Sequence, residues 1–168
     1  MKKTLCLLAL PLLLSQPGFA EDQNTAQILI GEWQCSQNLT PDEGINLSVE
    51  YIQLFTAQRN FTLDGSMKMK FTIAEMNQML GGDSLNYLFE GSGSWSTKLG
   101  YLTIKTENAT IKPNNPMAQQ LHQAGILDVN KLREMKSEDT FIINSLTSSN
   151  LKLTHVKEKF TTQCTRTQ

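Results

Sequence analysis

Few residues in this sequence have the types and spacing that chemistry requires. The two histidines, His122 and His155, have no metal-ligand spacing to another histidine, cysteine or carboxylate. The run Gly91-Ser92-Gly93-Ser94 lacks the Gly-x-Ser-x-Gly spacing of a nucleophile elbow and falls inside a predicted strand. No glycine-rich phosphate-binding loop precedes a helix. We therefore expect no enzymatic activity, no metal and no cofactor, and interpret both histidines as surface or half-buried structural residues.

The N-terminal residues have the pattern of a secretory signal peptide. Lys2 and Lys3 precede an apolar stretch of about ten residues, and small residues lead up to Ala20. The stretch is too short to span a bilayer, which needs about twenty residues. We predict a signal peptide over 1–20, a single domain over 21–168, no membrane anchor after cleavage, and a periplasmic or secreted protein.

The charge of the predicted mature chain argues against nucleic-acid binding. Loss of Lys2 and Lys3 leaves 13 of the 15 basic residues against 16 acidic residues, and the charges are scattered along the chain. Proteins that bind nucleic acids usually carry a basic face. We expect no nucleic-acid partner.

Two of the three cysteines, Cys35 and Cys164, remain after removal of the predicted signal peptide. In an oxidising compartment an isolated pair is most simply a disulfide, and two free thiols are the alternative. A disulfide between them would close a loop of about 130 residues, for which chain entropy gives about 4–5 kcal/mol of stabilisation.

Alternation of apolar and polar residues predicts a mainly β protein. The clearest example runs from Met67 to Ile73, where apolar residues occupy the odd positions. A three-residue loop, Leu63-Asp64-Gly65, is predicted before this strand, because it keeps the apolar residues of the two neighbouring strands on one face. Residues 106–112 either extend the strand before them or form a separate one. The predicted strands cover 31–37, 46–56, 57–62, 66–73, 85–95, 101–105, 140–145, 151–156 and 160–166.

Helical segments interrupt this pattern. Residues 74–80 form a short predicted helix that ends at Gly81-Gly82, and a helical insert covers about 115–136. In the insert, Asn115 caps a first helix that ends at Gly125, and Asp128 begins a second that continues to Met135. Residues 21–28 are interpreted as a loose lead-in or a short helical turn.

The two ends of the predicted domain pair if Cys35 lies opposite Cys164. In an antiparallel ladder with that register, Trp33 lies opposite Arg166. An arginine guanidinium stacks on an indole for about 0.5–2 kcal/mol. Pairing of the first strand with the last would close the sheet into a barrel without free edges.

Gly31-Glu32-Trp33 on the first strand and Arg166 on the last resemble the signature of lipocalins and the wider calycin-like barrels. In that signature the arginine packs over the tryptophan. The helical insert precedes the last three strands, whereas lipocalins place their helix after the eighth strand, so the resemblance is to divergent lipocalin-like domains of bacterial secreted proteins. It implies a closed or nearly closed antiparallel barrel of about eight strands.

The resemblance also implies a non-catalytic binding protein that holds a small apolar or amphipathic ligand. An alternative hypothesis is a periplasmic protein–protein module, either an inhibitor or a toxin-immunity protein with an envelope protein as partner. Methionines suit a pocket for varied apolar ligands and equally suit an irregular core. The expected ligand-lining residues are Tyr51, Phe55, Met67, Met69, Phe71, Tyr87 and Phe89.

Overall fold

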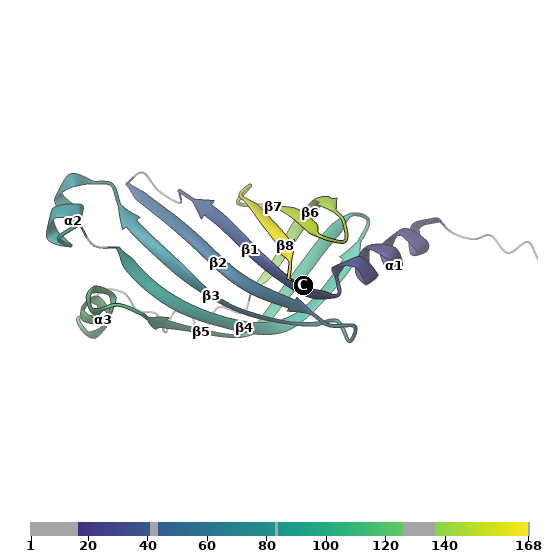
Figure 1. Ribbon diagram of the computed structural model, residues 1–168, viewed down its shortest axis with the longest axis horizontal. Helices are drawn as coiled ribbons and strands as arrows, with labels where there is room; N and C mark the ends of the chain where they lie inside the picture. Colours follow the sequence, from purple (N-terminus) through teal and green to yellow (C-terminus); the bar gives the residue numbers. More distant parts are fainter. Residues whose placement is uncertain (1–16, 41–43, 83, 126–136, 168) are drawn as a thin grey trace, which may run out of the picture.

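The computed structural model describes residues 17–40, 44–82, 84–125 and 137–167. Strands make up most of this part of the chain, and three helices accompany them (Figure 1). The strands are β1 (Gly31–Leu39), β2 (Ile45–Phe55), β3 (Asn60–Phe71), β4 (Leu85–Lys98), β5 (Tyr101–Pro113), β6 (Glu138–Leu146), β7 (Asn150–His155) and β8 (Thr161–Arg166). The helices are α1 (Pro17–Leu29), α2 (Ala74–Met79) and α3 (Pro116–Gln123).

The eight strands form a closed antiparallel barrel in sequence order. Each strand pairs with the next along the chain, and β8 returns to pair with β1. This confirms the predicted fold class: a mainly β chain whose first and last strands close the sheet.

The barrel has two different ends. β8 pairs with β1 over Trp33–Ser36, and β6 pairs with β5 over Tyr101–Lys105. The longer strands β2 to β5 continue past these pairings toward α2 and α3, while α1 lies at the opposite end (Figure 1). We call the end beside α1 the closed end, and the end beside α2 and α3 the helix end.

Residues with alternating polarity face alternately into the barrel and out to solvent. In β4, Leu85, Tyr87 and Trp95 are buried, and Leu88 between them is 44% exposed. From β1 to β4, odd-numbered residues pair with odd-numbered residues of the neighbouring strand, so the odd-numbered residues of these four strands point inward.

The predicted loop Leu63-Asp64-Gly65 is wrong, because these residues lie inside β3. The chain instead turns between Phe55 and Asn60, where the Thr56 N–H donates to the Asn60 carbonyl at 2.9 Å. Continuous pairing of β2 with β3 keeps the apolar residues on one face, so alternation alone did not separate the two arrangements. Gly65 serves packing: an added Cβ would lie 2.5 Å from the Cβ of Tyr51 and 2.8 Å from Cζ of Phe89.

The helices agree with the predicted ones where the structure describes them. α2 and α3 lie within the predicted segments, and the Asn115 side chain accepts a hydrogen bond from the Ala118 N–H at 3.2 Å. α1 is longer than the predicted lead-in over 21–28. The second predicted helix of the insert, from Asp128 to Met135, lies outside the described residues. Residues 106–112 extend β5 and form no separate strand.

Candidate functional site

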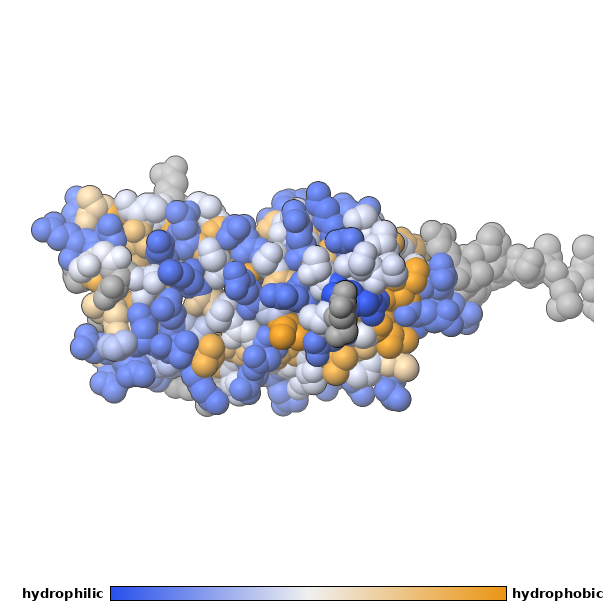
Figure 2. Space-filling view, viewed as in Figure 1, coloured by the Kyte–Doolittle hydropathy of each residue, from blue (hydrophilic) through white to orange (hydrophobic). Residues whose placement is uncertain are grey.

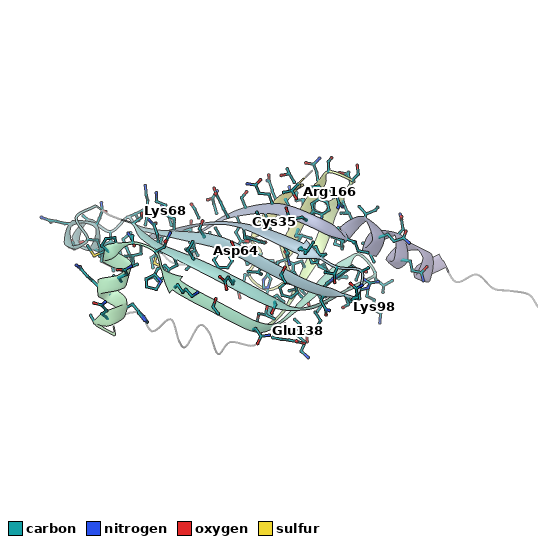
Figure 3. All side chains as sticks on the ribbon, turned by 60° about the horizontal axis from the view of Figure 1, so that its bottom comes forward. Cys35, Asp64, Lys68, Lys98, Glu138 and Arg166 are labelled. Atoms are coloured by element: carbon teal, nitrogen blue, oxygen red, sulfur yellow. A yellow bond between two sulfur atoms is a disulfide. The ribbon has the colours of Figure 1, made fainter. Side chains whose placement is uncertain are left out.

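Cys35 and Cys164 form a disulfide between β1 and β8, with their Cα atoms 4.0 Å apart. The two residues are direct partners in the ladder, and Trp33 is the direct partner of Arg166. Figure 3 shows Cys35 and Arg166 on the part of the sheet that adjoins α1. The predicted disulfide and the predicted register are therefore confirmed.

Arg166 and Trp33 fasten α1 to the closed end. The guanidinium carbon lies 4.2 Å from the indole centroid, and Nη1 donates to the Ile30 carbonyl at 2.9 Å. Nη2 donates to the Ile28 carbonyl, and the Trp33 indole N–H donates to the Leu29 carbonyl at 2.8 Å. These carbonyls belong to the C-terminal end of α1, where cationic donors are favoured. This cluster therefore stabilises the fold by joining α1 to the first and last strands.

A dense core fills the barrel at the closed end. Phe55 is 1% exposed and packs edge-on against Trp95, with ring centroids 5.3 Å apart. The structure therefore places Phe55, one of the expected ligand-lining residues, among core side chains. The buried members of this core are Ala26, Leu29, Trp33, Cys35, Phe55, Phe61, Trp95, Leu102, Ile104, Leu151, Leu153 and Cys164.

Tyr51 and Phe89 cross the middle of the interior. Their ring centroids are 6.2 Å apart, and both flank the Cα of Gly65. Burial raises the pKa of Tyr51 to about 12, and its hydrogen bond with Thr162 partly opposes this rise. The Thr162 hydroxyl also donates to the side-chain oxygen of Gln37 at 2.8 Å.

A second apolar cluster, the helix-end cluster, lies beyond this middle layer. Leu85, Tyr87 and Ala118 are its buried members, and Ala118 brings α3 against the inward face of β4. Four of the expected ligand-lining residues belong to it: Tyr87, Met67, Met69 and Phe71. The partly buried members are Met67, Met69, Phe71, Ile111, Met117 and Leu121.

Two buried polar atoms among the described residues have no hydrogen-bond partner, the hydroxyl of Tyr87 and Nε2 of Gln53. Each residue is only 2% exposed. Gln53 lies beside Trp33 in the closed-end core, whereas Tyr87 lies in the helix-end cluster. Burial raises the pKa of Tyr87, so its hydroxyl keeps its proton. Tyr87 was among the expected ligand-lining residues, whereas no sequence pattern singled out Gln53.

Four hollows of 270–380 Å³ are described on the barrel, and they lie mostly among polar residues. One groove runs over Leu63, Gly91 and Ala109, and another includes Tyr51 beside Glu50. Tyr51 is the one expected ligand-lining residue that borders any of these four. The face in Figure 2 is mostly hydrophilic, and its hydrophobic residues gather toward the end beside α1.

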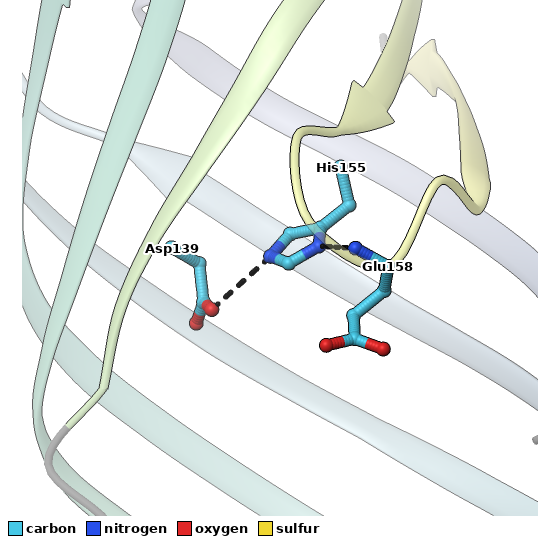
Figure 4. Close-up of polar contacts among 3 residues, drawn as sticks. All are labelled: Asp139, His155 and Glu158. Atoms are coloured by element: carbon cyan, nitrogen blue, oxygen red, sulfur yellow. Dashed lines mark hydrogen bonds and ion pairs between the residues drawn. The ribbon is translucent and has the colours of Figure 1, made fainter.

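His155 is more buried than predicted, at 5% exposure. Its ring stacks on Phe160 with centroids 4.9 Å apart. Figure 4 shows that both ring nitrogens have partners: Nδ1 accepts from the Glu158 N–H at 2.9 Å, and Nε2 lies 3.3 Å from Asp139 Oδ1. Because Nδ1 is an acceptor, Nε2 carries the proton and donates a hydrogen bond to the carboxylate. This arrangement leaves no ring nitrogen free to act as a base.

Within the described residues, no group of three or more histidine, cysteine or acidic side chains is placed to hold a metal ion. In the same part of the chain, no helix has the length and apolar character needed to cross a membrane. A search against protein-family models and a search against curated proteins each found no match for this chain.

Proposed function

We propose that this chain is a periplasmic or secreted, non-catalytic, lipocalin-like binding protein, whose helix end takes up a small apolar or amphipathic ligand. The observation that carries the proposal is the contrast in packing between the two ends of the barrel. At the closed end, large side chains such as Trp33 and Phe61 are fully buried. At the helix end, Leu85, Tyr87 and Ala118 are buried, but most of the cluster, including the inward-facing Met67 and Met69, is only partly buried.

The chemistry of the helix-end cluster supports an adaptable site. Met67, Met69 and Met117 each have several rotatable bonds and a polarisable sulfur, so their side chains can repack around a guest molecule. α3 packs on this cluster through Met117, Ala118 and Leu121. A ligand can therefore enter by displacing side chains, while the hydrogen bonds of the barrel stay intact.

The lipocalin-like assignment and the location have their own support. Arg166 packs over Trp33 in an eight-stranded antiparallel barrel, as the resemblance to lipocalins implies. The Cys35–Cys164 disulfide is typical of proteins exported to an oxidising compartment. The non-catalytic assignment draws on His155, whose two nitrogens are both engaged by protein groups.

Binding of N-phenyl-1-naphthylamine, an apolar dye that fluoresces in apolar surroundings, tests the proposal. We expect saturable binding to the purified, disulfide-bonded protein. Met69→Asn should weaken it at least about five-fold by placing an amide in the apolar site. The matched control Leu88→Asn changes an exposed residue on the outer face of β4 and should leave the affinity unchanged. Absence of saturable binding, or equal effects of the two substitutions, would refute the proposal.

A second candidate is a protein–protein module with an envelope protein as partner. Tyr101 and Ile142 are direct partners on β5 and β6, and they are 44% and 37% exposed. Leu99, in the adjoining turn, is 69% exposed. Exposed apolar neighbours of this kind suit a protein interface. Capture of one stoichiometric partner from cell-envelope extract, lost in Tyr101→Ser, would support this function, and capture of none would oppose it.

A further inference from the structure

The hydroxyl of Tyr87 is the most unusual polar group at the helix end. It is buried in the helix-end cluster and has no hydrogen-bond partner among the described residues. Leaving a buried donor unpaired is unfavourable, and native proteins rarely do so without a reason. A ligand oxygen that accepts from this hydroxyl would satisfy it.

The surroundings of Tyr87 favour an uncharged ligand group. Its ladder partners are Met67 on β3 and Pro113 on β5, and Leu85 and Ala118 are buried beside it. These four neighbours of Tyr87 are all uncharged. A single neutral hydroxyl does not offset the cost of removing an anion from water.

Nearby lysines belong to the outer face. Lys68 and Lys70 alternate with the inward-facing Met67 and Met69, and both lysines are exposed. Lys112 on β5 is likewise exposed and pairs with the outward-facing Leu88. In Figure 3, Lys68 lies on the part of the sheet near α2 and α3. These lysines are therefore on the wrong side of the sheet to neutralise an acid bound beside Tyr87.

We propose that Tyr87 is the polar anchor of the helix-end site, and that its ligand is an uncharged, lipid-like molecule with a carbonyl or ester oxygen. This inference rests on the proposed function and specifies its ligand class. The Tyr87 hydroxyl donates to that oxygen, and the alkyl part replaces side-chain contacts around Met67 and Met117. The hydroxyl has almost no contact with solvent in the ligand-free protein, so binding requires these thioether side chains to move.

Competition against bound N-phenyl-1-naphthylamine tests the ligand class. The probes are 2-decanone, which has a neutral carbonyl, and decanoate at pH 8, which has a similar chain and a charged head. We expect 2-decanone to displace the dye from the wild-type protein at a lower concentration than decanoate. Tighter displacement by decanoate would overturn the inference while leaving the proposed function intact.

Tyr87→Phe tests the anchor itself, because it removes the hydroxyl and keeps the ring. We expect about five-fold weaker binding of 2-decanone, in line with the loss of one hydrogen bond, and dye affinity within about two-fold of wild type. The matched control Tyr101→Phe alters an exposed tyrosine and should change neither. Unchanged binding of 2-decanone by Tyr87→Phe would overturn the inference.

Thermal unfolding of the ligand-free proteins gives a second, independent readout. Because the Tyr87 hydroxyl has no partner to lose, Tyr87→Phe should unfold at the same temperature as wild type or higher. A clear fall in unfolding temperature would show that the hydroxyl is paired within the protein, and would overturn the inference. If the wild-type protein binds no dye and no ketone, the proposed function fails and this inference fails with it.

Discussion

Arg166 lies over the indole of Trp33, 4.2 Å from its ring centroid, and donates hydrogen bonds to the carbonyls of Ile28, Ile30 and Ser148. One side chain from the last strand therefore joins the first strand, the end of α1 and the turn before β7. Arg59 makes a similar contact with Trp95, at 4.4 Å, from an exposed position in the β2–β3 turn.

Arg166→Lys should destabilise the protein by about 2–3 kcal/mol, because an ammonium group cannot stack on the ring and reach three carbonyls together. The matched substitution Arg59→Lys should cost less than about 1 kcal/mol, since its cation–π contact is exposed. Urea denaturation followed by tryptophan fluorescence measures both. Equal costs would contradict the role assigned to Arg166.

Removal of the disulfide by Cys35→Ala with Cys164→Ala should lower the free energy of unfolding by about 3–5 kcal/mol. The bond joins residues separated by 129 positions and so restricts the unfolded chain strongly. The β1–β8 ladder does not depend on the bond, so the far-ultraviolet circular dichroism of the variant should remain that of a β protein. Chemical denaturation measures the loss, and a loss below about 1 kcal/mol would show that the unfolded chain is little constrained.

Gly65→Ala should destabilise the barrel by about 2–3 kcal/mol, because the new Cβ would overlap the Glu50 carbonyl, Tyr51 and Phe89. Gly91→Ala is the control: its Cβ would lie 3.1 Å from Cγ of Leu63, a side chain that can shift. We expect a cost of about 1 kcal/mol or less there. Thermal melts of the two variants would refute the packing role of Gly65 if their unfolding temperatures were the same.

Asn115→Ala should destabilise the attachment of α3 by about 1–2 kcal/mol. Its side chain accepts from the N–H groups of Ala118 and Asn86 and donates to the Ser84 carbonyl at 2.7 Å. Asn114→Ala, which changes an exposed neighbour, should have little effect. Hydrogen exchange of the α3 amides reports the difference, and equal protection in both variants would contradict this role of Asn115.

Tyr51 makes stability depend on alkaline pH. Its pKa is raised from 10.0 to about 12 in the folded protein. Its contribution to the free energy of unfolding is therefore complete below pH 10 and is lost as pH rises toward 12. Over that range the wild type should lose about 1.4 kcal/mol per pH unit from this residue. Tyr51→Phe lacks the titrating group and should lose less stability between pH 9 and pH 11. Urea denaturation at these two pH values measures the stability of both proteins, and equal losses in the wild type and in Tyr51→Phe would refute the raised pKa of Tyr51.

Local patterns predicted much of the fold. Pairing the two cysteines across an antiparallel ladder was sufficient to predict that Trp33 lies opposite Arg166. Once one pair of such a ladder is known, the sequence positions determine all the others. The cap at Asn115 was also predictable, because capping involves neighbours in sequence. The β3 loop was misassigned because a loop and a continuous strand satisfied the same alternation.

The candidate site was only partly predictable. Inward parity identified Met67, Met69, Phe71 and Tyr87 as members of one face, since alternation is a local property of a strand. Their separation from Phe55, the burial of His155 and the unpaired hydroxyl of Tyr87 depend on which distant segments pack against each residue. The sequence by itself determined the faces of the strands and the closing register. The tertiary structure decided which end is tightly packed and where a buried polar group lacks a partner, because those properties arise from contacts between residues far apart in the chain.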